Sequence, residues 1–414
     1  MKYKRSLGWL NAIVLLTMVV AGCGDEGSRH VPTTINLGNF QAASVVIGQP
    51  NFTQGSANQG GAPGANTINA PFGNAAVGTL FVPDYGNNRV LGFNTVPTGN
   101  NASADFVLGQ PDFTSTACGD LANEMCGPET IVRAGARLLV NEFDNNRVLI
   151  WNSEPGTTQA PADVVVGQSG FGSSSGACTS AKLNGSESIA VGGGKLIVSD
   201  SNNNRVMIWN AIPTANGVAA DVVLGQNNFT TCVVNNDGSG GSAGPSAANF
   251  SYPAGAWTDG TRLVVADTNN NRVLIWNTFP TSNFQAADLV LGQNNFTCNV
   301  SNNNGTCVSG SVSANNLDAP YVGIFSNGTQ LFVADFFNSR VLVWNTFPTG
   351  NFQAADVVLG QNNFTCGAPN NDGTCGSGSP SANNLNLPNG VFQSGNRLIV
   401  SDEGNSRFLV YKGQ

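Results

Sequence analysis

The stretch that decides the fold is "LVVADTNNNRVLIWNTFP", residues 263–280, in which two apolar runs flank Asp267, a group of asparagines and Arg272. Short runs rich in Val, Leu and Ile on either side of a turn-forming segment are typical of a β-hairpin. Both runs are apolar throughout and do not alternate with polar residues, which indicates strands buried on both faces. The stretch therefore predicts a hairpin inside a larger β-sheet assembly.

The same pattern occurs six times. Its copies begin at Leu80, Leu138, Leu196, Leu263, Leu331 and Leu398. Their arginines are separated by 58, 58, 67, 68 and 67 residues. A second segment, "DVVLGQ" or a close variant, also occurs six times, first as "SVVIGQ" at residues 44–49. Self-similarity at a nearly fixed period indicates a repeat protein in which each period is one structural unit.

Composition agrees with an all-β chain. The 414 residues include 51 glycines and only 10% charged residues, with abundant Asn, Thr and Ser. Dense turn formers and few Lys and Glu argue against helices and for short strands joined by polar turns. A closed repeat array folds as a single unit, so we expect one folded domain.

Each period contains four predicted strands, named a to d in chain order. In the last full period they start at Pro320, Gln330, Arg340 and Asp356. Six four-stranded antiparallel sheets, buried on both faces, predict a six-bladed β-propeller, because ring closure leaves no apolar end exposed. The chain starts with a lone d-type segment (residues 44–49) and ends with an a–b–c set. We therefore expect the N-terminal strand to close the last blade.

The segments "LNLPNGVFQSGNRLIVSDEGNSRFLVY" (residues 385–411) and "LDAPYVGIFSNGTQLFVADFFNSRVLVW" (residues 317–344) resemble NHL repeats. NHL repeats have the form L-x-x-P-x-G-V, a turn, and then L-x-V-A-D-x-x-N-x-R-V. The resemblance covers nearly all of the mature chain and implies a six-bladed propeller, in agreement with the strand count. The long d–a loops lie outside the short family repeat.

The first 22 residues are typical of an export signal, with a basic start, a short apolar run and small residues before Cys23. The string "VAGC" (residues 20–23) resembles the bacterial lipoprotein cleavage box, which implies that Cys23 is lipidated and becomes the mature N-terminus. A lipoprotein's acyl chains suffice for stable membrane anchoring. We expect a signal peptide over residues 1–22, a lipidated tether over 23–42 and the propeller over 43–414. This predicts a lipid-anchored envelope protein, either periplasmic or at the cell surface.

The mature chain is acidic. Cleavage leaves 14 basic against 25 acidic residues, a net charge of −11. No basic stretch suits a phosphate backbone, so nucleic acid is not an expected partner.

If Cys23 carries the lipid, eight cysteines remain, and an even number in an oxidising compartment favours disulfides. Metal ligation is the weaker interpretation, because no histidine and no C-x-x-C motif accompany them. Three pairs each lie within one d–a loop: Cys118/Cys126, Cys298/Cys307 and Cys366/Cys375. The remaining two, Cys178 and Cys232, lie on d–a loops of adjacent blades at the same end, so we predict a bond between them.

An acid and an arginine face each other across each predicted b–c hairpin. The pairs are Asp84/Arg89, Glu142/Arg147, Asp200/Arg205, Asp267/Arg272, Asp335/Arg340 and Asp402/Arg407. A catalytic carboxylate is not needed six times, so we interpret these pairs as structural. Similarly, one aromatic position recurs in every c strand and is interpreted as packing between blades. Its residues are Phe93, Trp151, Trp209, Trp276, Trp344 and Tyr411.

Candidate catalytic residues are few, and we assign none. The lone histidine, His30, precedes the propeller, which excludes Ser-His-Asp and Cys-His nucleophiles in the folded domain. Glu129, Glu187 and Asp259 are unrepeated acids near strand a that could line the axial channel, but we favour solvated turn positions for them. The "NNDG" and "NNNG" loops make calcium a weak candidate and no cofactor the expectation.

Two functional classes remain. The first is a non-catalytic, membrane-anchored binding or scaffolding module, monomeric, with a protein or glycan ligand on the face that carries the b–c turns and long d–a loops. The second is a propeller enzyme, a lyase or hydrolase, using carboxylates and a central metal ion. The absence of histidine from the propeller favours the first class.

Overall fold

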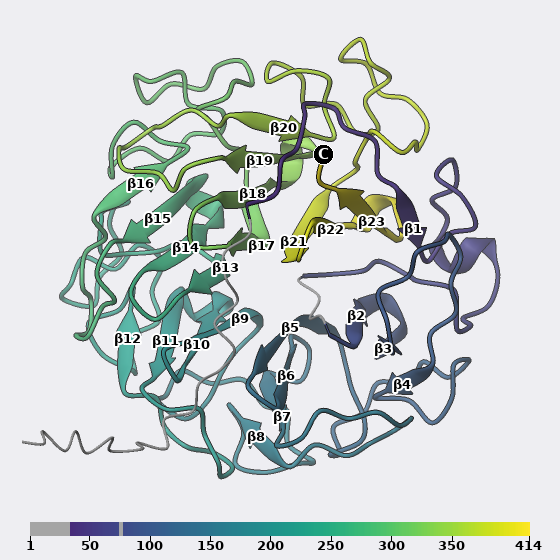
Figure 1. Ribbon diagram of the computed structural model, residues 1–414. Helices are drawn as coiled ribbons and strands as arrows, with labels where there is room; N and C mark the ends of the chain where they lie inside the picture. Colours follow the sequence, from purple (N-terminus) through teal and green to yellow (C-terminus); the bar gives the residue numbers. More distant parts are fainter. Residues whose placement is uncertain (1–33, 74–77) are drawn as a thin grey trace, which may run out of the picture.

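The structure is a computed structural model that describes residues 34–73 and 78–414. Its strands form six sheets arranged radially around a central axis, so the chain is an all-β, six-bladed propeller (Figure 1). Five blades have four described antiparallel strands; in blade 1 the order is β2-β3-β4, and residues 74–77, which precede β2, lie outside the described part. The sequence therefore predicts fold class and blade number correctly.

The strands follow the predicted a-to-d order outward from the axis. The a strands are β5 (Pro128–Ala134), β9 (Ser186–Gly192), β13 (Pro253–Thr258), β17 (Pro320–Ser326) and β21 (Pro388–Ser394). The b strands are β2 (Leu80–Asp84), β6 (Arg137–Glu142), β10 (Lys195–Asp200), β14 (Leu263–Asp267), β18 (Leu331–Asp335) and β22 (Arg397–Asp402). The c strands are β3 (Arg89–Phe93), β7 (Arg147–Trp151), β11 (Arg205–Trp209), β15 (Arg272–Trp276), β19 (Arg340–Trp344) and β23 (Arg407–Lys412). The d strands are β1 (Val45–Ile47), β4 (Phe106–Leu108), β8 (Val164–Val166), β12 (Val222–Leu224), β16 (Leu289–Leu291) and β20 (Val357–Leu359).

Short 3-10 helices occur in the loops at one end of the propeller. One, η1 (Ala57–Gly60), follows β1. The others form b–c turns: η2 (Tyr85–Asn87), η3 (Ser201–Asn203), η4 (Thr268–Asn270), η5 (Phe336–Asn338) and η6 (Glu403–Asn405).

The N-terminal strand closes the ring. β1 pairs antiparallel with β23, with Val45 opposite Val410 and Ile47 opposite Phe408. The first and last described strands of the chain therefore lie side by side in blade 6 (Figure 1). This confirms the predicted closure.

The residues before β1 also pack on the propeller. Ile35 and Leu37 are buried in the core cluster of blade 6, and the Ile35 amide donates to Gln330 Oε1 at 2.8 Å. The later part of the predicted tether, residues 34–42, is thus held against blades 5 and 6. The predicted signal peptide, Cys23 and His30 lie outside the described residues. Within the described ranges, no helix has the length and apolar character needed to cross a bilayer.

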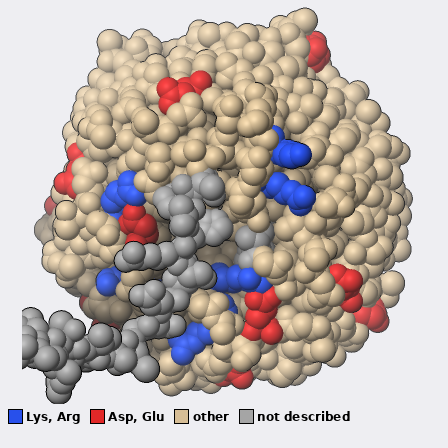
Figure 2. Space-filling model, viewed as in Figure 1, with Lys and Arg blue, Asp and Glu red and all other residues tan. Residues whose placement is uncertain are grey.

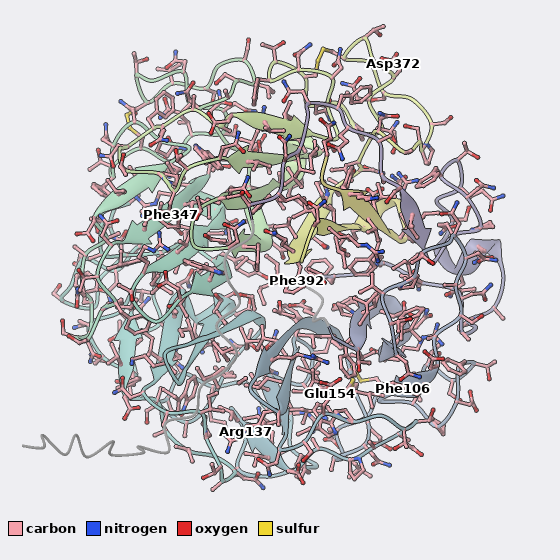
Figure 3. All side chains as sticks on the ribbon, viewed as in Figure 1. Phe106, Arg137, Glu154, Phe347, Asp372 and Phe392 are labelled. Atoms are coloured by element: carbon pink, nitrogen blue, oxygen red, sulfur yellow. A yellow bond between two sulfur atoms is a disulfide. The ribbon has the colours of Figure 1, made fainter. Side chains whose placement is uncertain are left out.

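The core consists of apolar layers between neighbouring blades, where side chains fill the space between sheets (Figure 3). The recurring aromatic of strand c lies in these layers. Trp209, Trp276 and Trp344 are each 1% exposed, and Tyr411 is fully buried. Burial of these large side chains confirms the packing interpretation, because an aromatic ring used for ligand stacking would be exposed.

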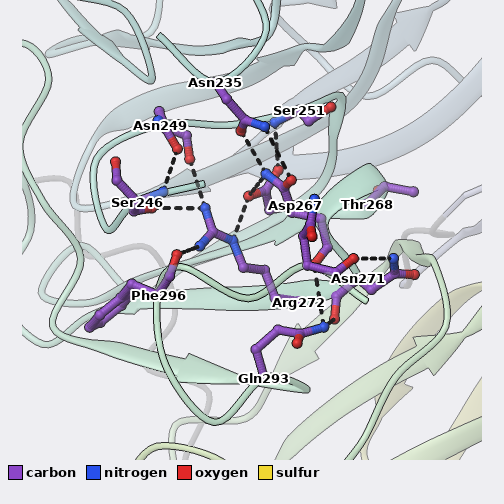
Figure 4. Close-up of polar contacts among 12 residues, drawn as sticks. Asn235, Ser246, Asn249, Ser251, Asp267, Thr268, Asn271, Arg272, Gln293 and Phe296 are labelled. Atoms are coloured by element: carbon purple, nitrogen blue, oxygen red, sulfur yellow. Dashed lines mark hydrogen bonds and ion pairs between the residues drawn. The ribbon is translucent and has the colours of Figure 1, made fainter. Parts of the chain in front are cut away.

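The b–c hairpin explains the asparagines of the repeated stretch (Figure 4). Asp267 Oδ2 accepts from Arg272 Nε at 2.7 Å and from Asn270 Nδ2 at 2.8 Å. Asn271 adopts a left-handed backbone conformation (φ 53°), which Asn tolerates, and its Oδ1 accepts from the Ala319 amide of the next blade. Asn270 and Asn271 therefore have separate structural roles in the turn.

The arginine of each hairpin also holds the loops. Arg272 Nη1 donates to the Phe296 carbonyl at 2.6 Å, and Nη2 donates to the carbonyls of Ser246 and Asn249 at 2.8 and 3.0 Å. One guanidinium thus fixes the loop before strand a and the loop after strand d. Burial raises the pKa of Asp267, while Arg272 and the hydrogen bonds from Asn270 and Ser251 lower it again. All six predicted acid–arginine pairs are formed, and every member side chain is fully buried.

The second repeated segment joins neighbouring blades. Gly292 has φ +82°, and a Cβ there would lie 2.8 Å from Leu317 Cδ1 of the next blade, so a side chain has no room. The following Gln293 donates through Nε2 to the carbonyls of Asn271 and Val300. In this "GQ" pair, which is the same in all six copies, the glycine therefore allows the next blade to approach closely and the glutamine holds the following loop by hydrogen bonds.

The eight cysteines form the four predicted disulfides, Cys118–Cys126, Cys178–Cys232, Cys298–Cys307 and Cys366–Cys375. All four lie at the end of the propeller that carries the d–a loops. The Cys178–Cys232 bond joins the loops that follow β8 and β12, with a Cα–Cα distance of 6.3 Å. It therefore links adjacent blades.

Replacing both Cys178 and Cys232 by Ser is expected to lower the free energy of unfolding by about 2–4 kcal/mol, because a long loop of the unfolded chain is released. The Cys298→Ser/Cys307→Ser variant is the control. Its bond spans 9 residues against 54, so its loss should be about 1–2 kcal/mol smaller. Equilibrium urea unfolding measures both, and equal losses would contradict the loop-length argument.

Candidate functional site

The two ends of the propeller differ in charge. The loop face is the end that carries the b–c turns and d–a loops; the turn face carries the a–b turns and c–d loops. Among the described residues, ten carboxyl groups on the loop face have no salt-bridge partner, and Lys182 is the one basic side chain there outside the hairpin arginines. The carboxyl groups belong to Asp112, Asp120, Glu124, Glu129, Asp144, Glu187, Asp237, Asp318, Asp372 and Glu403.

The turn face carries the other basic residues, which are visible around its centre (Figure 2). They are Arg133, Arg137, Lys195, Arg262, Arg397 and Lys412. Seven carboxyl groups also lie at this end, so the turn face is close to neutral while the loop face is strongly acidic. The negative charge of the propeller is therefore concentrated on the loop face.

An axial carboxyl cluster, made of Glu129, Glu187, Tyr252, Tyr321 and Glu403, lies at the centre of the loop face. Glu129 and Glu187 are second residues of a strands, which places them next to the axis, and each is 2% exposed. Glu187 Oε1 accepts from the hydroxyl groups of Tyr252 and Tyr321, the latter at 2.8 Å. These groups come from blades 2, 3, 4, 5 and 6 and meet only because the ring is closed.

Aromatic rings close the channel beside the carboxyl groups. The Phe72 and Tyr321 rings, from blades 1 and 5, meet edge to face with centroids 5.5 Å apart. Phe336 packs on Tyr321 at 5.2 Å, and Tyr85 packs on Phe72 at 5.4 Å. The loop-face mouth is consequently an aromatic surface with carboxyl groups beneath it.

Burial raises the pKa values of the glutamates in the axial carboxyl cluster. It raises the pKa of Glu187 to about 7, although the hydrogen bonds from Tyr252 and Tyr321 oppose the rise. Burial, together with the nearby Glu187 charge, raises the pKa of Glu129 well above its usual range. Burial likewise raises the pKa of Glu403 to about 7. Contact between the two carboxyl groups raises the pKa of Glu129 further and lowers that of Glu187, so Glu129 holds its proton more firmly than Glu187 does.

The interpretation of Glu129 and Glu187 as solvated turn residues is wrong, because both are buried on the axis. It holds for Asp259, which lies in an a–b turn on the turn face and pairs with Arg262 at 2.7 Å. The sequence analysis missed Glu403, Tyr252 and Tyr321. One signal was available in the sequence. The second residue of strand a is Glu, Glu, Ala, Tyr and Asn in blades 2–6, so this position varies between blades, whereas most other positions of the repeat keep the same residue type.

The arrangement offers two kinds of chemistry. A protonated and an ionised carboxyl group in contact can act as an acid–base pair. An acidic, aromatic mouth also suits a cationic group, through charge and cation–π attraction. Within the described ranges, no group of three or more His, Cys, Asp or Glu side chains has a geometry suited to a metal ion. The calcium candidates form turns: in the "NNDG" of residues 370–373 Asp372 Oδ1 accepts from the amides of Thr374 and Gly376, and in the "NNNG" of residues 302–305 Asn304 Oδ1 accepts from the Thr306 amide.

The raised pKa values predict that the protein becomes less stable as pH rises from about 5 to 7.5. Above about pH 5 the unfolded glutamates have lost their protons, while the folded Glu187 and Glu403 lose theirs only near pH 7, so each group contributes a slope of at most about −1.4 kcal/mol per pH unit. The Glu187→Gln variant should show a shallower decline in the free energy of unfolding, measured by urea unfolding at pH 5 and 7.5. The Glu154→Gln variant, at an exposed pair on the turn face, is the control; an unchanged slope in Glu187→Gln would contradict the shift.

The channel opens at the turn face into an apolar pocket of about 240 Å³. Its walls come from the second halves of strands β5, β9, β13, β17 and β21, and include Ile131, Ile189, Trp257, Phe325 and Phe392. Arg133 is the charged residue of the wall. Phe392 lies near the centre of the ring (Figure 3).

No family model and no curated protein matches the chain, so membership of the NHL family stays a prediction. Several solved structures are similar at low identity. A Bacteroides thetaiotaomicron protein of unknown function has a TM-score of 0.45 at 12% identity, covering 90% of this chain and 75% of its own. A streptogramin B lyase has a TM-score of 0.39 at 12% identity, and the match covers 83% of this chain and 93% of the lyase. The Staphylococcus aureus virginiamycin B lyase has a TM-score of 0.38 at 10% identity, and the match covers 84% of this chain and 97% of the lyase. These likenesses are distant, and the fold assignment rests on the strand topology.

Proposed function

We propose that the protein is an exported, lipid-anchored propeller that acts as a binding module in the cell envelope. Its loop face takes a protein or glycan partner that carries positive charge. The observation that supports this most is the segregation of charge: the loop face has ten unpaired carboxyl groups, seven of them outside the axial carboxyl cluster, against one lysine. A face of one sign attracts partners of the opposite sign and speeds their association.

Loop rigidity supports a binding role as well. Four disulfides lie on this face, and the hairpin arginines fix the bases of the d–a loops. Loops that are already ordered lose little conformational entropy on binding. The exposed Phe337, at 59% exposure, and the half-buried Phe336 add apolar contact area near the mouth.

The proposed anchor is compatible with an outward-facing loop face. Gln41 donates to the Lys412 carbonyl, and Ile35 contacts Gln330, so the described chain begins at the turn face. The segment between Cys23 and Thr34 spans at most about 40 Å when fully extended. With Cys23 lipidated, the turn face lies toward the membrane and the loop face is free to meet a partner.

The test is site-specific photo-crosslinking in intact envelopes. A photoreactive residue at Phe337, on the loop face, is expected to capture the partner, and one at Val218, in a c–d loop of the turn face, is the matched control. Raising salt from 50 to 300 mM should reduce capture at 337, since the attraction between exposed charges is screened. Equal capture at both sites, or none at 337, contradicts the proposal.

A second experiment tests for a glycan partner by calorimetry, with the full chain carrying Cys23→Ser. A chitosan oligosaccharide, which carries amines, should bind more tightly than its fully N-acetylated counterpart. The loop tips at residues 304–308 and 372–376 can be replaced by short Gly-Ser linkers, with Cys298 and Cys366 changed to Ser. These changes spare the Ser313 and Asn316 carbonyls that Arg340 needs, unlike removal of the whole loops. Unaltered binding of a partner by both tip variants would exclude the tips from the binding face.

The carboxyl pair favours a second function, that of an acid–base enzyme, either a lyase or a hydrolase. Glu187 would act as the base and Glu129 as the acid, with the two tyrosines stabilising the anionic form of Glu187. The Glu187→Gln variant separates the two functions. It abolishes turnover by the pair, while partner capture at residue 337 should fall little, because Glu187 is buried and the exposed carboxyl groups of the loop face remain.

A further inference from the structure

We infer that the apolar pocket at the turn-face end of the channel is a second binding site, for a small aromatic or short-chain carboxylate. This site lies at the opposite end of the axis from the loop face, and it is independent of the proposed partner. Its evidence is the pocket itself and the arginine in its wall.

The pocket has the size of a small ligand. Its volume of about 240 Å³ lies between the roughly 150 Å³ of a cavity that holds benzene and the 300 Å³ at which drug-sized sites begin. Ile131, Ile189, Trp257, Phe325 and Phe392 make its wall mostly apolar. A molecule of about 10–12 non-hydrogen atoms with one hydrocarbon end matches this volume and lining.

Arg133 supplies the polar contact. Its Nη2 pairs with Glu154 and donates to the Thr79 carbonyl, while its Nε is buried and has no hydrogen-bond partner among the described residues. A buried donor without a partner is costly, and a ligand oxygen that accepts from it recovers that energy. The carboxylate fits better than a neutral acceptor because a charge-assisted hydrogen bond is stronger.

Positive charge beside the pocket favours an anion. The Arg262 guanidinium lies next to the wall, over the Trp257 ring at 5.6 Å and the Phe347 ring at 4.0 Å, and Asp259 balances its charge at 2.7 Å. Arg137, Lys195, Arg397 and Lys412 lie at the ends of strands on the same face. A cationic ligand of the same shape would gain no hydrogen bond from the Arg133 Nε and would be repelled by these four basic residues.

The test is isothermal calorimetry on the full chain carrying Cys23→Ser, without detergent. 3-Phenylpropionate is expected to bind, and 3-phenylpropan-1-amine, its size-matched cation, to bind at least tenfold more weakly. Arg133→Met should weaken phenylpropionate binding at least tenfold, while Arg137→Met, which removes a charge outside the pocket wall, should change it by less than twofold. Equal binding of acid and amine, or no binding of the acid at 5 mM, overturns the proposal.

A steric variant gives an independent check. Val191 lines the pocket and is only partly buried at the edge of the core layer between blades 2 and 3, so Val191→Trp fills the cavity from the rim of that layer. It should abolish phenylpropionate binding at an unchanged melting temperature. Trp257 is the tryptophan of the pocket wall, so a change in the total tryptophan fluorescence on titration reports occupancy, and this change should be absent in Val191→Trp. A full fluorescence response in that variant would place the ligand elsewhere.

Discussion

Replacing Arg272 by Met is expected to lower the free energy of unfolding by about 3–5 kcal/mol. The substitution leaves the Asp267 carboxylate buried without its cation, and removing one member of a buried pair carries a penalty of this size. It also leaves the carbonyls of Ser246, Asn249 and Phe296 without the guanidinium that binds them. Urea unfolding followed by tryptophan fluorescence measures the loss.

Arg262 provides the control, since it is also an arginine of blade 4 paired with an aspartate at 2.7 Å, but on the surface. Its side chain is 21% exposed and that of Asp259 is 30% exposed, so water screens the pair. Arg262→Met should lower the free energy of unfolding by about 1 kcal/mol or less. Similar losses in the two variants would show that the six hairpin pairs add little beyond ordinary packing.

The double variant Asp267→Leu/Arg272→Met separates charge from packing. With both charges gone, no buried ion remains unpaired, and the loss should be smaller than in Arg272→Met alone. The loop carbonyls still lack a donor, and Asn270 and the Ser251 amide lose their acceptor, so the double variant should still be less stable than the native protein. A double variant as unstable as the single one would attribute the loss to these hydrogen bonds and not to the unpaired charge.

The sequence predicts the architecture well because the fold is repeated. Six copies of a hairpin with an acid, asparagines and an arginine in fixed positions report the same local structure, and copy number equals blade number. The lone d-type segment, residues 44–49, is enough to predict ring closure. The Cys178–Cys232 bond follows as well, because chain order alone places both cysteines in equivalent loops.

The axial carboxyl cluster could not be predicted in the same way. Glu187 and Tyr321 are 134 residues apart and meet only across the channel, at a separation that depends on ring diameter and blade twist. A repeat also predicts the structural role only of residues that recur in every copy, whereas the residues of the axial carboxyl cluster do not recur. Glu403 follows the recurring Asp402 in a turn and has no local feature that indicates burial. The turn-face pocket depends on the same unpredictable diameter.

Deleting residues 44–49 is expected to destabilise the propeller by several kcal/mol. The deletion removes β1, and with it the antiparallel ladder to β23 in which Val46 faces Leu409. Val45, Val46 and Ile47 are at most 6% exposed, and burial of each such side chain contributes about 1.5–3 kcal/mol. Loss of β1 also exposes Phe408 and Val410, which pack in the same cluster, and leaves an open edge on β23.

A six-residue deletion in an exposed loop, residues 239–244, controls for chain shortening. Most of these residues are exposed, and the loop is closed by contacts within itself, such as the Asp237 amide to the Gly241 carbonyl at 2.8 Å. This control should cost about 1 kcal/mol or less, because changes away from buried contacts have small effects. The melting temperature of both variants decides the matter. If removal of β1 and removal of the loop lower it equally, β23 does not depend on β1, and the ring is held closed by the contacts of blade 6 with its neighbours alone.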